Sequence, residues 1–185
     1  MSKKAPVTRR TAATSQPKAK SKAKSAGRPP HVAIIVSRYT RTVTDALLAG
    51  ALAEADRLDA AASVYDAAGA FEILGTAAAA AESGRFDGIL SLGCIIKGET
   101  KHDDYLAHAV TSGLGNLSVA TGIPVSLGVL TVNTQQQALD RAGGKHGNKG
   151  GEAMTALLDM IGICRAIRAG TSAPQLSGKP DKLKR

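Results

Sequence analysis

The stretch Leu90-Ser-Leu-Gly-Cys-Ile-Ile-Lys-Gly-Glu-Thr-Lys-His-Asp-Asp-Tyr105 decides the fold, because an apolar run passes abruptly into a polar turn. The run from Gly88 to Ile96 is typical of a strand buried on both faces of a parallel sheet. It stops at Gly98, and polar residues follow up to His102. Ligands of parallel α/β sheets bind just outside the carboxyl ends of the strands. The turn after this strand is therefore the first candidate for a binding site.

Strands and helices alternate on both sides of this stretch. Strands are predicted over residues 31–36, 62–66, 87–96 and 124–130. Helices are predicted over residues 44–58, 75–83, 103–121, 133–142 and 152–168, with Thr44 and Asn133 capping the first and the fourth. This alternation predicts an α/β protein, a single-domain, three-layer α/β/α sandwich around a four-stranded, mainly parallel sheet. The glycine-rich residues 143–151 are predicted to be a flexible connector.

Positive charge is concentrated outside the predicted domain. Residues 1–30 hold nine Lys or Arg and no acid, and residues 171–185 hold four basic residues against one acid. The remaining 11 basic and 14 acidic residues give residues 31–170 a net charge of −3. We therefore expect a disordered basic arm over 1–30, an α/β domain over 31–170 and a disordered basic tail over 171–185. An anion-binding arm and an organelle transit peptide are alternatives for residues 1–30.

Composition also argues against several classes of protein. No apolar segment is long enough for a membrane span or a signal peptide, and a cytoplasmic protein is expected. Cys94 and Cys164 lie in apolar runs, as reduced core thiols do, and without a CxxC or His/Cys cluster no metal site is expected. A body of net negative charge with three Tyr, two Phe and no Trp predicts no specific nucleic-acid binding.

Polar and aromatic residues follow all four predicted strands and suggest a composite site at one edge of the sheet. Tyr39 follows the first strand and Phe71 the second, where the rings either stack on a planar ligand or belong to the core. Glu72 either accepts hydrogen bonds from a ligand or stabilises a first helical turn. His102 lies at the end of the third strand, where an imidazole suits proton transfer. Arg141, a helix beyond the fourth strand, is either a phosphate clamp or a solvated charge.

Four ordered motifs resemble those of the lumazine synthase family. They are Gly69-Ala-Phe-Glu-Ile73, Leu92-Gly-Cys-Ile-Ile-Lys-Gly-Glu-Thr-Lys-His102, Gly128-Val-Leu-Thr131, and Gln137-Ala-Leu-Asp-Arg-Ala-Gly143 with Gly147-Asn-Lys-Gly150. The likeness runs from about Val32 to Arg168 and implies a flavodoxin-like fold. It also implies an enzyme that needs no cofactor or metal and has two small-molecule substrates. That enzyme condenses 5-amino-6-(D-ribitylamino)uracil with 3,4-dihydroxy-2-butanone 4-phosphate and releases phosphate, the penultimate step of riboflavin biosynthesis.

The resemblance assigns a role to each matching position. It implies that the pyrimidine and its ribityl chain contact Tyr39, Ala70, Phe71, Glu72, Cys94, Ile95, Ile96, Leu127 and Lys149. It implies that the phosphate contacts Glu99, Thr100 and Arg141 and that His102 transfers protons. The chain departs from the common pattern at Ala68 and Leu74, where prolines are usual, at Asp103 and Leu127, where aromatic residues are usual, and at Lys97, where arginine is commoner.

The family also implies an assembly. Its site lies between neighbouring subunits of a homopentamer, with Leu127 and Arg141 reaching the site of the next subunit. A 60-subunit icosahedral capsid, a decamer and an isolated pentamer are the alternatives for the whole particle, and riboflavin synthase is a candidate partner. The competing function is that of a catalytically weak paralogue that binds flavin or lumazine or acts as a scaffold.

Overall fold

A four-stranded parallel sheet forms the middle layer of the molecule. The computed structural model describes residues 28–177. The strands are β1 (His31–Ser37), β2 (Ala61–Ala67), β3 (Gly88–Ile96) and β4 (Val125–Val132), in the order β2-β1-β3-β4. All three pairings are parallel, so every carboxyl end points to the same edge. The predicted α/β sandwich with a four-stranded sheet is confirmed.

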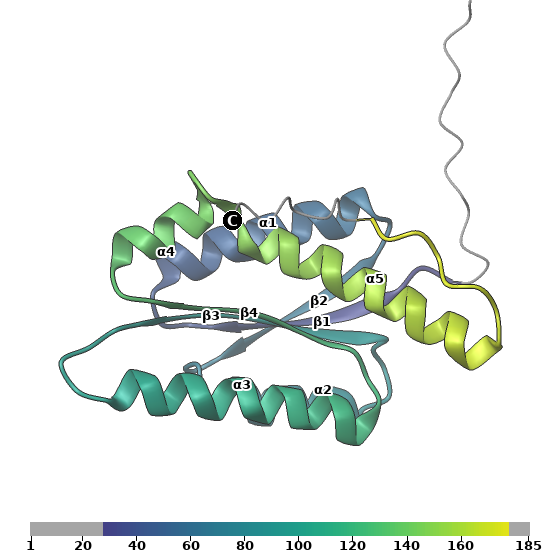
Figure 1. Cartoon of the computed structure of the whole chain (residues 1–185), viewed down its shortest axis with the longest axis horizontal. Helices are drawn as coiled ribbons and strands as arrows, with labels where there is room; N and C mark the ends of the chain where they lie inside the picture. Colours follow the sequence, from purple (N-terminus) through teal and green to yellow (C-terminus); the bar gives the residue numbers. More distant parts are fainter. Residues whose placement is uncertain (1–27, 178–185) are drawn as a thin grey trace, which may run out of the picture.

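Helices cover both faces of this sheet (Figure 1). One face carries α1 (Arg41–Arg57), α4 (Gln135–Arg141) and α5 (Lys149–Ala169), and the other carries α2 (Ile73–Glu82) and α3 (His102–Thr121). Alternating residues of β1 belong to two separate cores. Val32 and Ile34 join the core under α1 and α5, whereas Ala33 and Ile35 join the core over α2 and α3. A central parallel strand must be apolar on both faces, which explains the unbroken apolar run.

Two predicted helix caps are wrong. The helix predicted to be capped by Thr44 begins at Arg41, and Thr44 is fully buried inside it. Its N-cap residue is Thr40, a residue type typical of helix starts, but the Thr40 side chain makes no capping bond. The next error is smaller: Thr134, not Asn133, caps α4, and its hydroxyl accepts the Gln137 N–H.

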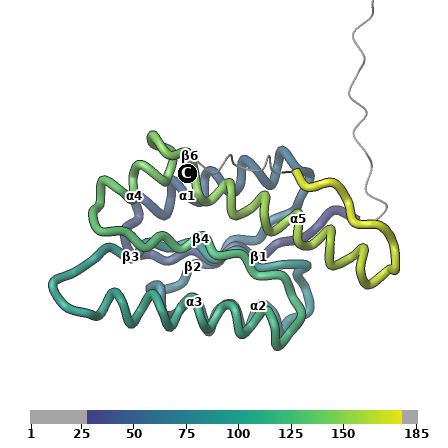
Figure 2. The backbone as a smooth tube through the Cα atoms, in the orientation of Figure 1, coloured from purple at the N-terminus to yellow at the C-terminus, as the bar shows by residue number. Residues whose placement is uncertain are grey.

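The glycine-rich segment is an ordered junction and not the predicted flexible connector. Residues Ala142–Gly144 (β5) pair with Gly147–Asn148 (β6) in a small antiparallel hairpin that leads directly into α5 (Figure 2). The last helix therefore begins at Lys149 and not at Glu152. The Asn148 side chain accepts the N–H groups of Gly150 (2.9 Å) and Gly151 (3.2 Å). These two bonds satisfy donors that the first turn of a helix otherwise leaves unpaired.

The same side chain ties α5 to α1. Its Nδ2 donates to the carbonyl of Ala46, 2.8 Å away in the middle of α1. Beside this bond the backbone of Gly150 approaches the backbone of Leu47 so closely that a Cβ at position 150 would overlap the Leu47 carbonyl. Gly150 is therefore required by close helix packing, and Gly143 and Gly147 are required by the left-handed backbone of the hairpin, with φ of +119° and +75°.

The ends of the described chain are fastened to the domain. Arg28 pairs with Asp87 (3.0 Å), just before β3. At the other end the N–H of Ser177 donates to the Asp159 carboxylate of α5 (2.8 Å). The predictions of disorder for residues 1–27 and 178–185 lie outside the described residues. Within the described chain, no helix combines the length and the apolar character that a membrane crossing requires.

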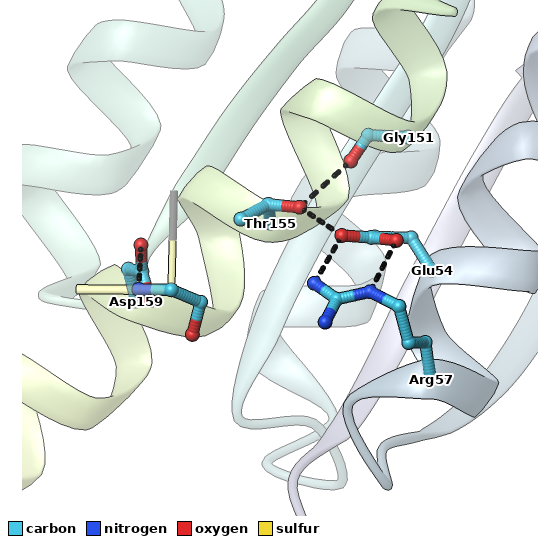
Figure 3. A network of polar contacts seen from close by, with 6 residues as sticks. Glu54, Arg57, Gly151, Thr155 and Asp159 are labelled. Atoms are coloured by element: carbon cyan, nitrogen blue, oxygen red, sulfur yellow. Dashed lines mark hydrogen bonds and ion pairs between the residues drawn. The ribbon is translucent and has the colours of Figure 1, made fainter. Parts of the chain in front are cut away.

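A second polar link joins α1 and α5 on the outside of the molecule (Figure 3). Arg57 donates to both carboxylate oxygens of Glu54, at 2.6 Å and 2.8 Å, and the hydroxyl of Thr155 lies 2.7 Å from one of them. The hydrogen bonds from Arg57, and then that from Thr155, outweigh partial burial and lower the pKa of Glu54 from 4.5 to about 2. The ionised carboxylate is therefore the form that the folded state favours.

We expect the Glu54 link to add to the free energy of unfolding, by an amount that decreases at acidic pH. Because the folded pKa of Glu54 lies below the unfolded one, its contribution is complete above pH 4.5 and is lost as the pH falls toward 2. Glu54→Gln should cost about 1–2 kcal/mol at pH 7 and less than that at pH 3. Urea unfolding at both pH values and fixed protein concentration measures this, with Thr155→Val as the control that removes the interhelical bond alone. A Glu54→Gln cost that is equal at pH 7 and pH 3 would contradict the assignment.

Candidate functional site

An open pocket of about 920 Å³ lies outside the carboxyl ends of β1, β2 and β3. Strand order reverses between β1 and β3, because β2 lies on one side of β1 and β3 on the other. Such a switch point is where doubly wound α/β sheets bind ligands. The lining consists of Arg38, Tyr39, Thr40, Ala68, Gly69, Ala70, Phe71, Glu72, Cys94, Ile95, Ile96, His102, Asp103, Tyr105, Leu106 and Ala109.

The turn from β1 into α1 supplies the first wall. Tyr39 is 71% exposed, which is unusual for an aromatic side chain outside a binding surface. Thr40 has a φ of +57°, a left-handed conformation that is uncommon for a β-branched residue. Arg38 is held at the rim by Asp66, 3.1 Å away at the end of β2. An exposed ring between a fixed arginine and a strained residue indicates a turn shaped to present Tyr39.

The turn from β2 into α2 supplies the second wall. A Cβ at Gly69 would lie 2.8 Å from a carboxylate oxygen of Glu72 and 3.3 Å from the Tyr39 ring, so glycine lets the two turns approach. Phe71 is 57% exposed beside them. Glu72 is the N-cap residue of α2 but its side chain makes no capping bond. Its carboxylate therefore faces the pocket region without serving its own helix.

The end of β3 forms the floor. Cys94 and Ile95 are buried, and Ile96 is partly exposed where the strand ends. Burial raises the pKa of the Cys94 thiol to about 11, so the group is a neutral thiol near pH 7. The floor is thus apolar and uncharged, and it suits the face or edge of a heterocycle better than an anion.

The polar turn after β3 and the start of α3 supply the third wall. The hydroxyl of Thr100 accepts the backbone N–H of His102 (3.3 Å), and Asp103 accepts that of Gly98 (3.3 Å). His102 is the first residue of α3 and lines the pocket. The arrangement places an exposed imidazole at the junction of the apolar floor and the polar turn, where a proton donor and acceptor can reach a bound molecule.

The structure brings together most of the residues that the resemblance singled out, but not all of them. The pocket lining includes Tyr39, Ala70, Phe71, Glu72, Cys94, Ile95, Ile96 and His102. Glu99 and Thr100 lie in the adjoining turn between β3 and α3. Three turns of the predicted composite edge therefore meet at the pocket. The turn after β4 does not, because β4 is the edge strand beyond β3, whereas the pocket lies at the ends of β2, β1 and β3.

The remaining three predicted residues lie elsewhere on the same chain. Leu127 is 46% exposed on β4, which is an edge strand. Arg141 ends α4 and donates to the carbonyl of Gln137 (3.0 Å). Lys149 begins α5 and pairs with Glu152 (2.5 Å). None of the three lines the pocket described for this chain.

The sequence predictions found His102 but missed the three pocket residues that follow it on α3. Tyr105, Leu106 and Ala109 line the pocket with His102, at helical positions i+3, i+4 and i+7 from it. Residues at this spacing share one face of a helix, so the stripe follows from His102 once α3 is placed. Tyr105 is 70% exposed, and with Tyr39 and Phe71 it makes three exposed aromatic rings around one pocket.

A family model and a known relative both match this chain, and they carry the same description. Residues 29–165 match the family model described as 6,7-dimethyl-8-ribityllumazine synthase. The chain is also 42% identical over 142 residues to the 6,7-dimethyl-8-ribityllumazine synthase of Edwardsiella ictaluri (strain 93-146). That alignment covers 75% of this chain and 91% of the relative. The match to the family model includes all the strands and turns that form the pocket.

The neutral, buried thiol on the pocket floor should be unreactive. In a Cys164→Ser variant, we expect iodoacetamide to label native Cys94 at pH 8 at least about 100-fold more slowly than in the urea-unfolded chain, because the thiolate is scarce. Mass spectrometry of timed samples measures the rate, and the native rate should rise with pH toward 11. Native labelling as fast as unfolded labelling would show that Cys94 is neither buried nor shifted.

Proposed function

The chain belongs to the 6,7-dimethyl-8-ribityllumazine synthase family, and from that premise we propose that its strand-end pocket is the site of the reaction. The protein is a lumazine synthase, a transferase of riboflavin biosynthesis. Its substrates are 5-amino-6-(D-ribitylamino)uracil and 3,4-dihydroxy-2-butanone 4-phosphate, and phosphate leaves. The observation that carries the assignment to this pocket is the meeting of eight family-matched residues in one lining.

The apolar half of the pocket suits the pyrimidine. Tyr39 and Phe71 offer exposed ring faces, and a planar heterocycle gains by stacking on such a face. The backbone at Cys94–Ile96 ends a strand and so offers peptide groups to the edge of the heterocycle. Glu72, which makes no capping bond to its own helix, is placed to accept hydrogen bonds from the ribityl hydroxyls.

The polar turn suits the phosphate, but no unpaired Lys or Arg side chain of the described pocket lining is available to bind it. Backbone N–H groups and the Thr100 hydroxyl lie where the chain enters α3, and N–H groups at a helix start bind oxyanions. Arg38 is the one Lys or Arg of the described lining, and Asp66 already pairs with it. A dianion there needs another positive side chain. We assign that role to Arg141 of a neighbouring subunit, since Arg141 is remote from the pocket of its own chain.

His102 is assigned to proton transfer. Imine formation, loss of phosphate and ring closure each move a proton near neutral pH, the range in which an imidazole exchanges protons readily. His102 stands between the apolar floor and the phosphate turn, within reach of both substrates in this assignment. Holding two reactive molecules together in the correct orientation supplies a large share of the rate.

A shared site requires an oligomer, and we propose a homopentamer as the smallest active unit. Leu127 is exposed on the edge strand β4, where it can complete the wall of a neighbour's pocket. Closed symmetry is the usual arrangement of such homo-oligomers. A capsid of twelve pentamers, with riboflavin synthase as its partner, is the larger form of this proposal. The two free thiols fit a cytoplasmic location.

His102→Ala should slow turnover by about 10²–10⁴, the usual loss when a general acid or base is removed. Lumazine absorbance after mixing both substrates measures the rate, and wild-type turnover also separates an enzyme from an idle, flavin-binding scaffold. His108→Ala is the matched control, because His108 is exposed on the same helix and lies outside the pocket lining. Equal rates for the two variants would remove His102 from the mechanism.

Mixing two impaired variants should restore activity if the site is shared. His102→Ala and Arg141→Ala, unfolded together in equal amounts and refolded, should recover activity in about a quarter of the sites, because each intact site needs one unaltered residue from each neighbour. Arg141→Ala alone should raise the KM of the phosphate substrate far more than that of the pyrimidine, since a charged hydrogen bond is worth about 1.5–3 kcal/mol. No recovery on mixing would place both residues in one chain's site.

A further inference from the structure

We propose that the carboxylate of Asp103 determines how strongly the phosphate substrate binds, because it places a negative charge inside the turn that receives the phosphate. This inference rests on the proposed function and concerns the same pocket. Asp103 is thus a specificity-determining residue and not a catalytic one. It acts on one substrate and leaves the other alone.

The geometry fixes where this charge lies. Oδ1 of Asp103 accepts the backbone N–H of Gly98 (3.3 Å), so the side chain folds back across the turn between β3 and α3. Asp103 is only partly exposed and lines the pocket next to His102. Its carboxylate is therefore directed at the turn and the pocket, whereas an ordinary first-turn carboxylate of a helix points into solvent.

The turn contains no charge that cancels it at close range. Lys97 and Lys101 are exposed and lie outside the pocket lining, as does Glu99. From Lys97 to Asp104 the chain has two basic and three acidic side chains, a net charge of −1. The turn thus holds one partly buried carboxylate, and two of its backbone N–H groups already donate within it, that of Gly98 to this carboxylate and that of His102 to Thr100.

Coulomb repulsion gives the size of the effect. For a monoanion and a dianion about 6 Å apart in a medium with a dielectric constant near 80, the repulsion weakens binding about tenfold. A partly buried carboxylate experiences a lower dielectric constant, which strengthens the repulsion, and salt screens it. The uncharged pyrimidine, bound over the apolar floor, experiences little of this field.

The same side chain has a second, opposite role that can be separated from its charge. By accepting the Gly98 N–H it holds the turn that carries Thr100 and His102. Asparagine keeps a carbonyl oxygen of the same reach but removes the charge, whereas alanine removes both. Asp104 provides the matched control, because it carries the same charge in the same helical turn but is exposed and lies outside the lining.

Steady-state kinetics on the assembled enzyme tests the proposal with Asp103→Asn, Asp103→Ala and Asp104→Asn. Asp103→Asn should lower the KM of the ketone phosphate about three- to tenfold and should lower the inhibition constant of inorganic phosphate in parallel. It should leave kcat and the KM of the pyrimidine within about twofold. Asp103→Ala should keep the gain in phosphate affinity and lose turnover several-fold, because the turn is released. Asp104→Asn should match the wild type.

Salt provides a readout that a purely structural role would not change. Raising NaCl to about 0.5 M shortens the screening length and should bring the ketone-phosphate KM values of wild type and Asp103→Asn together. An unchanged ketone-phosphate KM in Asp103→Asn would overturn the proposal. An equal fall of this KM in Asp104→Asn would also overturn it, since the effect would then not depend on the place of Asp103 in the pocket. A wild-type enzyme that forms no lumazine would instead overturn the proposed function.

Discussion

The amide side chain of Asn148 holds the two long helices of one layer together, and the position of the first pocket wall depends on it. It pairs the first N–H groups of α5 and at the same time donates to the middle of α1. With Gly150 against the backbone of Leu47, the helices are fixed in both spacing and register. Because α1 begins at Arg41, directly after Tyr39 and Thr40, this junction also fixes the turn that presents the exposed ring. A hydrogen bond between residues 102 positions apart in the sequence thereby helps to position one wall of the pocket.

The sheet brings the other walls to the same place. β1 is apolar on both faces, and it pairs with β2 on one side and with β3 on the other. The turns after all three strands then open at one edge, and each adds a different kind of group. The turn after β1 adds Tyr39, that after β2 adds Phe71 and Glu72, and that after β3 leads to His102. Parallel pairing brings the three turns together, and the residues that each turn carries give the pocket an apolar and a polar half.

Patterns within one element could be predicted from the sequence, and contacts between elements could not. The apolar run before Gly98 and the polar turn after it gave the β3 strand and the place of His102 correctly. The start of α1 was missed because Thr40 adopts a left-handed conformation and makes no side-chain cap. The glycines of 143–151 were interpreted as flexibility because the reason for Gly150, contact with the backbone of α1, lies far away in sequence. Tyr105 was missed because its side of α3 is defined only by the neighbouring turns.

Under the proposed function, a single chain supplies only part of what the reaction needs. It offers three exposed rings, an imidazole and a neutral floor, but the lining has one cation, which Asp66 neutralises, and two carboxylates, Glu72 and Asp103. On its own this pocket attracts a planar, hydroxylated molecule and repels a dianion. Recognition of the phosphate must therefore come mainly from a neighbour, through Arg141, while the stacking of the pyrimidine on Tyr39 and Phe71 stays within the chain. Assembly then controls the affinity for the phosphate substrate, and its effect on the pyrimidine is confined to the wall that Leu127 completes.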